Sequence, residues 1–395
     1  MKFLKNKVVL FLLLVLAVLY FSSDFALIDI EKTAIIVAIA IDKENDDFSV
    51  TAQIAVPQST DNASSNDDAI MTAEGTTVLE AINNIGKDTG WHPKLSFCSM
   101  IFISRELAQE DVEHVVDFFM SSEKVQNSAI IAMADDKASD LLLADTPLDS
   151  ISSFALQKIV LKNEWMVSTV GVTNIKKFAF MNYSKAKTAY MPVIRIIKGK
   201  TKGGGNSSGL SPTAAQSGSG GEEGGNKKEE VIFSASEIAL FKNGKFVGQL
   251  TDRETLCYYL LEGPVFEAYT SVDVGEDGYF LRLDASSFSV DVDVKKSTVK
   301  LSLDMKVVVA DSTSGADLKN FNKKADVDKA VLDALVDSTE STARSMFAKL
   351  QSIDADLFMI KDKIYKYHNS LYERFKDKPL SRYTLELNFS ARPAD

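Results

Sequence analysis

A glycine-rich segment in the middle of the chain does most to constrain its fold. It spans residues 199–230 and reads GKTKGGGNSSGLSPTAAQSGSGGEEGGNKKEE, with half of the twenty glycines of the chain and Leu210 as its only large apolar residue. Such a stretch cannot bury enough apolar surface to offset the entropy lost when it is ordered. We interpret it as a flexible linker or a disordered insert.

The parts on either side of this segment have the composition of folded domains. Of the 395 residues, 45% are hydrophobic and 25% are charged, which excludes a fully disordered chain and a membrane protein with many spans. The net charge of −11 argues against nucleic acid as a partner, since neutralising phosphates needs clustered Lys and Arg. We predict four regions: 1–28 as a signal peptide or membrane anchor, 29–198 as an N-terminal domain, 199–230 as the linker or insert, and 231–395 as a C-terminal domain.

The first residues have the pattern of an export signal. Lys2, Lys5 and Lys7 precede an unbroken apolar run of fourteen residues. A full membrane span needs ~20 residues, so the run is short. No good cleavage site follows, which favours an uncleaved anchor, although a cleaved signal stays open. The positive-inside rule places the lysines in the cytoplasm and the remaining chain outside it. The predicted anchor is marked by Val8, Leu12, Leu16 and Phe21.

The N-terminal part contains both strand and helix patterns. Residues 35–41 are continuously apolar and residues 48–56 alternate, with a polar turn between them, as in a β-hairpin. Thr77 and Glu80 have the spacing of a capping box at a helix start. Residues 159–179 give no clear pattern. We further expect a polar loop over 60–69, strands over 97–103, 129–134 and 189–197, and helices over 107–120 and 138–143.

The C-terminal part has the same mixture of patterns. Asn243-Gly244 predicts a hairpin, and Thr251 with Glu254 forms a second capping box. Residues 299–309 alternate cleanly between apolar and polar, as in an antiparallel sheet with one solvated face. We also expect strands over 236–241, 245–249, 279–283, 287–294 and 383–389, and helices over 251–260, 326–352 and 357–367. The helix over 326–352 has few apolar residues near 338–342, where a break is possible. Strands and helices are segregated here, so the fold class is α+β, with mixed, largely antiparallel sheets and packed helices in two or three domains.

No catalytic or metal-binding motif is visible. The chain lacks a nucleophile elbow, a metalloprotease His pair and an EF-hand loop. His92, His114 and His368 are too scattered for a zinc site and fit solvated or packing roles. Acidic pairs at 67–68 and 135–136 leave a calcium role open but fit solvated loops better. We therefore expect no enzyme activity, no cofactor and no bound metal.

The two cysteines, Cys98 and Cys257, are 159 positions apart. An oxidising compartment would permit a disulfide. We favour two buried thiols in separate domains, because nothing else in the sequence resembles a scaffold held by disulfides.

Four segments together resemble the spore germination Ger(x)C family, the C subunit of nutrient germinant receptors. They are IIVAIAIDKENDDFSVTAQIAVP at 35–57, the helix, strand and FISRELAQ of 76–109, ALFKNGKFVGQLTDRE at 239–254, and QSIDADLFMIKDKIYKYHNSLYERF at 351–375. Their order and spacing match over nearly all of residues 30–390. The positions that carry the family signature are Asp42, Gln53, Pro57, Phe241, Gly248, Leu250, Glu254 and Asp356.

This resemblance implies a non-enzymatic, extracytoplasmic subunit of mixed sheet and helix domains. It would lie on the outer face of the spore inner membrane of an endospore-forming bacterium, beside integral membrane subunits of A and B type. Two departures stand out. Family members usually carry a lipid-modified Cys after the apolar run, which here reads AVLYFSSDFA at 17–26, so the apolar helix would have to replace the lipid. The glycine-rich insert is also long, although it falls between family blocks, where an insert is tolerable.

Three functions remain in view. The leading one is a membrane-anchored subunit that acts in assembly of a germinant receptor and in signal relay during germination. The alternatives are an exported solute-binding module and, with less support, an exported hydrolase whose site escapes recognition.

Overall fold

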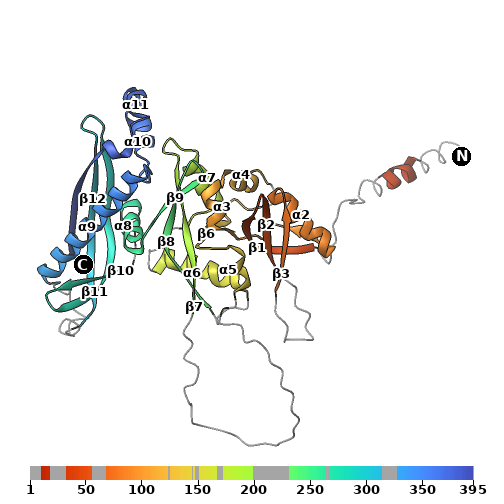
Figure 1. The fold of residues 1–395 in the computed structure, drawn as a ribbon, viewed down its shortest axis with the longest axis horizontal. Coiled ribbons are helices and arrows are strands. Elements are labelled where there is room, and N and C mark those ends of the chain that lie inside the picture. Colours follow the sequence, from red (N-terminus) through yellow and green to blue (C-terminus); the bar gives the residue numbers. More distant parts are fainter. Residues whose placement is uncertain are drawn as a thin grey trace, which may run out of the picture.

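The computed structural model describes residues 10–17, 33–55, 68–122, 125–144, 146, 151–166, 172–198, 231–263, 265, 267–313 and 327–394. Apart from the short stretch at 10–17, these residues form two β-sheets that lie side by side, each with helices packed against it (Figure 1).

The first sheet has nine strands, in the order β3-β2-β1-β5-β6-β7-β8-β9, with the short β4 also paired to β1. Its centre, β1-β5-β6-β7, is parallel, and both flanks are antiparallel. The strands are β1 (Thr33–Glu44), β2 (Asp47–Ala55), β3 (Asp68–Gly75), β4 (His92–Lys94), β5 (Met100–Ile103), β6 (Ile130–Ala134), β7 (Thr188–Lys198), β8 (Val231–Lys242) and β9 (Lys245–Leu250).

Helices cover both faces of the first sheet, which explains why β1 is apolar without interruption. On β1, Ile39 and Ile41 face one hydrophobic cluster while Ala38 and Ala40 face another. A strand buried on both faces needs apolar side chains at every position. The first cluster includes residues of α2 (Val78–Thr89), α3 (Arg105–Glu110), α4 (Glu113–Ser121) and α7 (Ile175–Asn182), and the second those of α5 (Ser139–Leu143) and α6 (Ser152–Met166).

The second sheet has four strands in the order β10-β11-β12-β13, and one of its faces is solvated. On β12 the side chains at 299, 301, 303, 305 and 307 are buried, and those between them are partly exposed. The alternation arises because helices cover only one face. The strands are β10 (Ala268–Val274), β11 (Asp277–Asp293), β12 (Thr298–Ser312) and β13 (Thr384–Pro393).

Strands β12 and β13 are parallel, and the described part of the connection between them holds three α-helices and a short 3-10 helix, Leu380–Arg382. Parallel neighbours cannot be joined by a tight turn, so the chain must cross over between them. The helices of this crossover are α9 (Lys329–Ser352), α10 (Ile360–Tyr367) and α11 (Asn369–Phe375).

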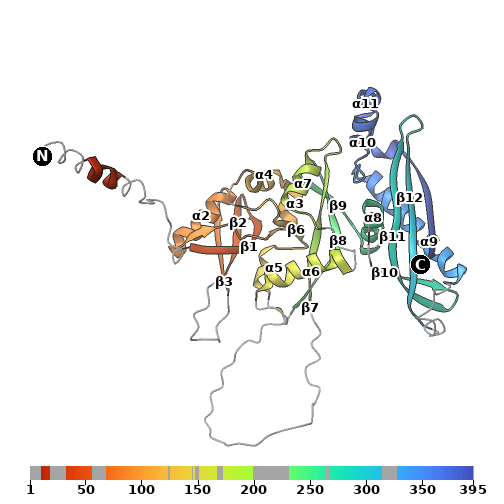
Figure 2. The ribbon, with the colours of Figure 1, turned by 180° about the vertical axis from the view of Figure 1, so that it is seen from behind.

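Helix α8 (Asp252–Glu262) lies between the two sheets (Figures 1 and 2). Seven of its residues are buried, and they are spread around the helix rather than confined to one stripe. A helix whose buried residues are spread around its circumference needs packing partners on several sides. Accordingly α8 packs against α9 and against strands of both sheets, and one core cluster runs through both halves.

The predicted α+β class with mixed sheets is confirmed, as are both hairpins and both helix starts. Several predicted details were wrong. The helix expected over 107–120 is interrupted at Asp111 and Val112, which separate α3 from α4. The strands at 279–283 and 287–294 are one continuous strand with a bulge near Ser286. Strands β3 and β10 were not predicted, and Asp68 and Ala69, expected in a loop, belong to β3.

Two further expectations were corrected in the C-terminal part. The strands and helices were expected not to form a βαβ unit, yet β12, α9–α11 and β13 form one because β13 pairs in parallel with β12. Helix α9 continues through residues 338–342 without a break. Within this part the hydroxyls of Thr339 and Thr342 donate to the carbonyls of Leu335 and Ser338, one turn earlier.

Several predictions fall on residues that the structure does not describe. These are the linker at 199–230, Pro57, Val8, Phe21 and most of the predicted anchor. Residues 10–17 are helical, with the side chains of Leu12 and Leu16 60% and 56% exposed. Among the described residues, none lies in a helix that has both the length and the hydropathy needed to cross a membrane.

Candidate functional site at the junction of the two sheets

Five of the predicted signature positions lie at the ends of elements that meet between the two sheets. Phe241, Gly248 and Leu250 are on β8 and β9, Glu254 is in the first turn of α8, and Asp356 follows α9. We call the contacts that these segments make with α9, α10 and the loop 353–359 the sheet junction. Phe241 and Leu250 are fully buried, and the Phe241 ring packs edge-on against Phe178 at 5.3 Å.

Glu254 joins the helix start of α8 to α9. Its carboxylate accepts hydrogen bonds from the backbone and the hydroxyl of Thr251 at 3.0 and 3.1 Å, which completes the predicted capping box. The same carboxylate receives Lys349 Nζ at 2.5 Å and Ser345 Oγ at 3.2 Å, both from α9. Lys349 Nζ also donates to the carbonyl of Gln249 at 3.2 Å. One carboxylate therefore fixes α8 and α9 to each other.

The surroundings of Glu254 decide its charge. Only 5% of the residue is exposed, and burial by itself raises the pKa of a carboxyl group. The hydrogen bonds from Lys349 and Thr251 outweigh burial, so the pKa of Glu254 lies below its ordinary value. The site thus holds a charged carboxylate at neutral pH, with each oxygen bonded to a protein group.

Two contacts tie the hairpin of β8 and β9 to the loop that follows α9. A Cβ atom placed on Gly248 would lie 3.1 Å from Ile353 Cδ1, so a larger residue here would press on this side chain. Lys242 Nζ, at the end of β8, lies 2.6 Å from Asp354 Oδ2. The other oxygen of Asp354 accepts the backbone N–H of Leu380 at 2.7 Å, and burial is again outweighed, so its pKa is lowered.

Asp356 is buried beneath the start of α10. Its two oxygens accept the backbone N–H groups of Ile360 and Lys361, each at 2.8 Å, so the side chain caps this helix. Its own N–H donates to Thr188 Oγ1, at the start of β7, at 3.0 Å. Burial raises the pKa of Asp356 to about 6, although the two N–H donors favour the charged form.

A carboxylate within α10 binds the loop at the same end of β7. Asp362 accepts the backbone N–H groups of Lys185 and Ala186 at 3.0 and 2.8 Å. These residues precede β7, so α10 is hydrogen-bonded to the loop that leads into this strand. Rings extend the contact, with Tyr258 of α8 lying 5.5 Å from Tyr190 of β7 and 5.8 Å from Phe358.

The remaining described signature positions, Asp42 and Gln53, lie elsewhere, where β1 and β2 meet α5 and α6. The Asp42 carboxylate accepts the N–H groups of Ala138 and Ser139 at 2.7 and 2.9 Å, and so caps α5. Gln53 donates to Ser152 Oγ and accepts the N–H of Ser153, both at 3.1 Å, at the start of α6. Both residues have structural roles within the first domain.

Several residues that complete these contacts could not be predicted from the sequence. Lys349, Thr188 and Asp362 have no local pattern, because their partners are 95 to 177 positions away. A further network joins Asp135, after β6, to Arg105 and Arg195, and Arg195 in turn lies 2.7 Å from Glu237 on β8. The acidic pair at 135–136 had been interpreted as solvated, whereas Asp135 is paired with both arginines.

The polar and aromatic side chains of the junction are bonded to one another and to backbone groups. Its carboxylates are bonded to backbone, lysine or hydroxyl donors, and no cluster of metal-binding side chains occurs within the described ranges. The side chains of His92, His114 and His368 are exposed and lie on different elements. Cys98 and Cys257 are buried and unpaired, and burial raises the pKa of each thiol to about 12, so both stay protonated.

Comparisons with known proteins agree with this architecture. The family model described as the spore germination protein N-terminal domain matches residues 27–196, and the one described as spore germination B3/GerAC-like, C-terminal, matches residues 236–391. YfkR from Bacillus subtilis (strain 168), a protein named for spore germination, is 23% identical over 188 residues. These residues are 46% of this chain and 48% of YfkR, so the match spans about half of each.

A solved structure extends the likeness of the fold to nearly the whole chain. The crystal structure of the GerBC protein matches with a TM-score of 0.50 and 14% identity, over 90% of this chain and 97% of that one. At this identity the match bears on the fold alone.

Proposed function

The chain belongs to the Ger(x)C family of spore germination proteins, and from this membership we propose that it is a non-enzymatic subunit of a nutrient germinant receptor. In this role it assembles with integral membrane subunits of A and B type. It lies on the outer face of the spore inner membrane and helps to relay nutrient occupancy during germination.

One observation carries the proposal. Both halves of the chain match a domain model of spore germination proteins, in the same order and on either side of the glycine-rich segment. The site chemistry agrees with a binding role, because the buried carboxylates at the sheet junction are occupied by protein donors. Attachment to the membrane rests on the basic and apolar pattern of residues 2–21.

The sheet junction gives the relay a physical route. The hydrogen bonds of Asp354 with Lys242 and of Asp356 with Thr188 join strands of the first sheet to the loop after α9. Glu254 joins α9 to the start of α8. A partner that displaces one sheet must move the other or break these bonds, because densely packed elements transmit displacement rather than absorb it. The subunit would therefore respond to its partners as a coupled pair of sheets.

The experiment is germination of spores that lack the gene. Dipicolinate release is measured after exposure to nutrients and, in parallel, to a trigger that bypasses the receptors. We expect loss of the nutrient response alone, and its return when the wild-type chain is restored. Nutrient release at the wild-type rate in the deletion spores would contradict the proposal.

A second strain tests attachment and assembly. The deletion is complemented with a chain in which residues 1–28 are replaced by a cleavable export signal. We expect the protein to be made and exported but absent from the inner-membrane fraction, with no recovery of the nutrient response. Immunoblots of the A- and B-type subunits in the same membranes then report whether receptor assembly depends on this chain.

A further inference from the structure

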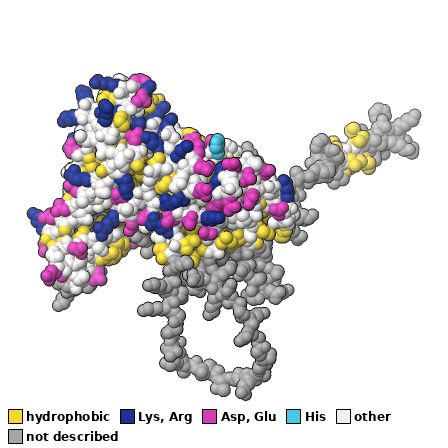
Figure 3. All heavy atoms as spheres, in the orientation of Figure 1, with side chains coloured by type: hydrophobic (Ala, Val, Ile, Leu, Met, Phe, Trp, Pro, Cys, Tyr) yellow, Lys and Arg dark blue, Asp and Glu magenta, His cyan; other side chains and the backbone are white. Residues whose placement is uncertain are grey.

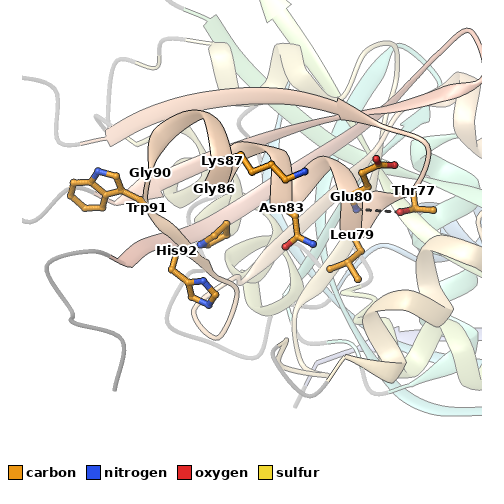
Figure 4. A pocket seen from close by; sticks show the side chains of 10 residues that line it. Thr77, Leu79, Glu80, Asn83, Gly86, Lys87, Gly90, Trp91 and His92 are labelled. Carbon is orange, nitrogen blue, oxygen red and sulfur yellow. Dashed lines mark hydrogen bonds between the residues drawn. The ribbon is translucent and has the colours of Figure 1, made fainter. Parts of the chain in front are cut away.

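An exposed apolar surface lies at the end of the molecule where the N-terminal segment joins the first sheet. Trp91 is 44% exposed, Phe97 is 57% exposed and Leu79 is 49% exposed. Leu79 and Trp91 line the two ends of one open hollow along α2, with Glu80, Asn83 and Lys87 between them (Figure 4). Lys94 Nζ lies 6.0 Å from the centre of the Phe97 ring. We call Leu79, Trp91 and Phe97 the α2–β4 patch.

The backbone explains why these side chains are exposed. Gly90 ends α2 in the left-handed conformation, with φ of 72° and its N–H bonded to the carbonyl of Gly86. The chain then turns outward, and Trp91 projects away from the end of the helix (Figure 4). Its neighbour His92 begins β4, which fixes the position of the turn against β1.

The pairing of β4 places the patch beside the first described residue of β1. Thr33 pairs with His92, and Ile35 pairs with Lys94. The apolar run ends at Phe21, twelve positions before Thr33. An extended chain of this length spans at most about 40 Å. A bilayer that holds the apolar run therefore lies within reach of Trp91.

The side chains of the patch suit the boundary between lipid and water. Tryptophan is enriched at membrane interfaces because its ring is apolar and its indole N–H is polar, and lysines extend their charges toward the headgroups. Lys87 and Lys94 flank the patch. At the opposite end of the long axis, Lys and Arg side chains gather around α10 and α11 (Figure 3), so the two ends differ in character.

We propose that the α2–β4 patch rests in the interfacial zone of the bilayer that anchors the N-terminal segment, and that it sets the orientation of the first domain on the membrane. The inference rests on the membrane attachment in the proposed function. It adds the surface that faces the lipid.

Tryptophan fluorescence of the full-length chain in vesicles tests this contact. The protein has two tryptophans, Trp91 and Trp165, so the Trp165→Phe variant reports on Trp91 alone. It is reconstituted in vesicles of phosphatidylcholine and phosphatidylglycerol whose acyl chains carry bromine either near the headgroup or near the methyl end. We expect emission to shift to shorter wavelength and to be quenched, more strongly by bromine near the headgroup.

Two variants locate the contact. In a chain without native tryptophans (Trp91→Phe, Trp165→Phe), Phe97→Trp reports on the patch and Tyr367→Trp on the opposite end, where Tyr367 is 67% exposed. We expect quenching at position 97 and none at 367. Equal quenching at both positions would show that the protein lies unspecifically on the lipid, and would overturn the proposal.

The outcomes separate this inference from the proposed function. If the protein stays with the vesicles after carbonate washing but Trp91 is not quenched, the anchor is real and the patch does not touch lipid. In that case a protein partner would have to cover it. If the protein is released by the wash, membrane attachment itself fails, and both proposals fail with it.

Discussion

Lys198 at the end of β7 pairs with Val231 at the start of β8, although thirty-two residues separate them in the chain. The glycine-rich segment therefore leaves the first sheet and returns to it at adjacent positions. Strands β8 and β9, which follow the segment, extend this sheet before the chain passes to the second. The segment stands where a hairpin turn would otherwise be.

This geometry predicts that a short turn can replace residues 199–230. Shortening the loop from thirty-two residues to four removes three doublings of loop length, which should raise the free energy of unfolding by about 2 kcal/mol. Urea unfolding of the exported part of the chain measures this. The control is a segment of equal length and composition in scrambled order, which should leave stability unchanged. Loss of the nutrient response in the shortened chain alone would show that the segment has a binding role.

The ion pair between Glu254 and Lys349 predicts unequal effects for two cations of α9. Replacing Lys349 with Met leaves a buried carboxylate without its cation, and we expect a loss of about 2–4 kcal/mol. The side chain of Arg344 is 58% exposed and forms an ion pair with Glu340 on the same helix. Changing Arg344 to Met should therefore lower the free energy of unfolding by less than about 0.5 kcal/mol.

Adding Glu254→Gln to Lys349→Met should restore part of that stability, because the buried charge is removed. The pair of variants also tests the relay. Spores with the double variant should contain normal amounts of the subunit yet release dipicolinate more slowly than spores with Arg344→Met. Equal release in both strains would remove the ion pair from the relay.

Asp356 predicts a fall in stability as the pH rises. Its folded pKa, raised by burial to about 6, exceeds the ordinary value of 3.8, so between these values the folded protein holds a proton that the unfolded chain has released. Stability from this group is therefore fully present below about pH 4 and is lost as the pH rises through 6, by about 3 kcal/mol. The measurement is urea unfolding from pH 3.5 to 7 for wild type and Asp356→Asn, which does not titrate.

The stability of wild type relative to Asp356→Asn should fall as the pH rises from 3.5 to 7. All other titrating groups are shared by the two proteins, so this change reports on Asp356. A pH-independent difference would mean that the two N–H donors hold the carboxylate charged throughout. Glu254 acts in the opposite sense, since its pKa is lowered, and its contribution is lost only as the pH falls below its ordinary value near 4.5.

The hydrogen bonds that Asp42 accepts from the start of α5 predict that this family-signature position has a structural role. Asp42→Ala leaves one buried and one partly buried N–H group at the start of α5 without acceptors, at a cost of about 1–3 kcal/mol. Asp42→Asn keeps one acceptor and should cost less. The exposed Asp88 on α2 is the control, and Asp88→Ala should change the unfolding midpoint little. If Asp42→Ala abolished germination without loss of stability, Asp42 would instead belong to a contact with a partner.

Elements with strong local patterns were predicted correctly, and the failures have physical causes. The hairpin of β1 and β2, the helix starts at Thr77 and Thr251, and the alternation of β12 each depend on residues within about twenty positions of one another. The reciprocal capping box forms at Thr251, whereas Glu80 accepts from Thr76 rather than from Thr77. Strands β3 and β10 were not predicted because both lie at the edge of a sheet. Edge strands carry mixed side chains, and pairing with a neighbour decides their conformation. The parallel pairing of β13 with β12 was not predicted because no local sequence pattern shows which distant strands pair.

The sequence alone determined the class of fold and the resemblance to a family, because these follow from composition, periodicity and short motifs. The division at 199–230 stays a prediction, and the first sheet continues past it into β8 and β9. The sequence also singled out Phe241, Gly248, Glu254 and Asp356 as signature positions by that resemblance. Only the tertiary structure brought these positions together and supplied Lys349, Thr188 and Asp362 as partners. The reason is physical: a hydrogen bond or ion pair acts over a few ångströms, and which distant segments come that close is decided by how two sheets pack around α8.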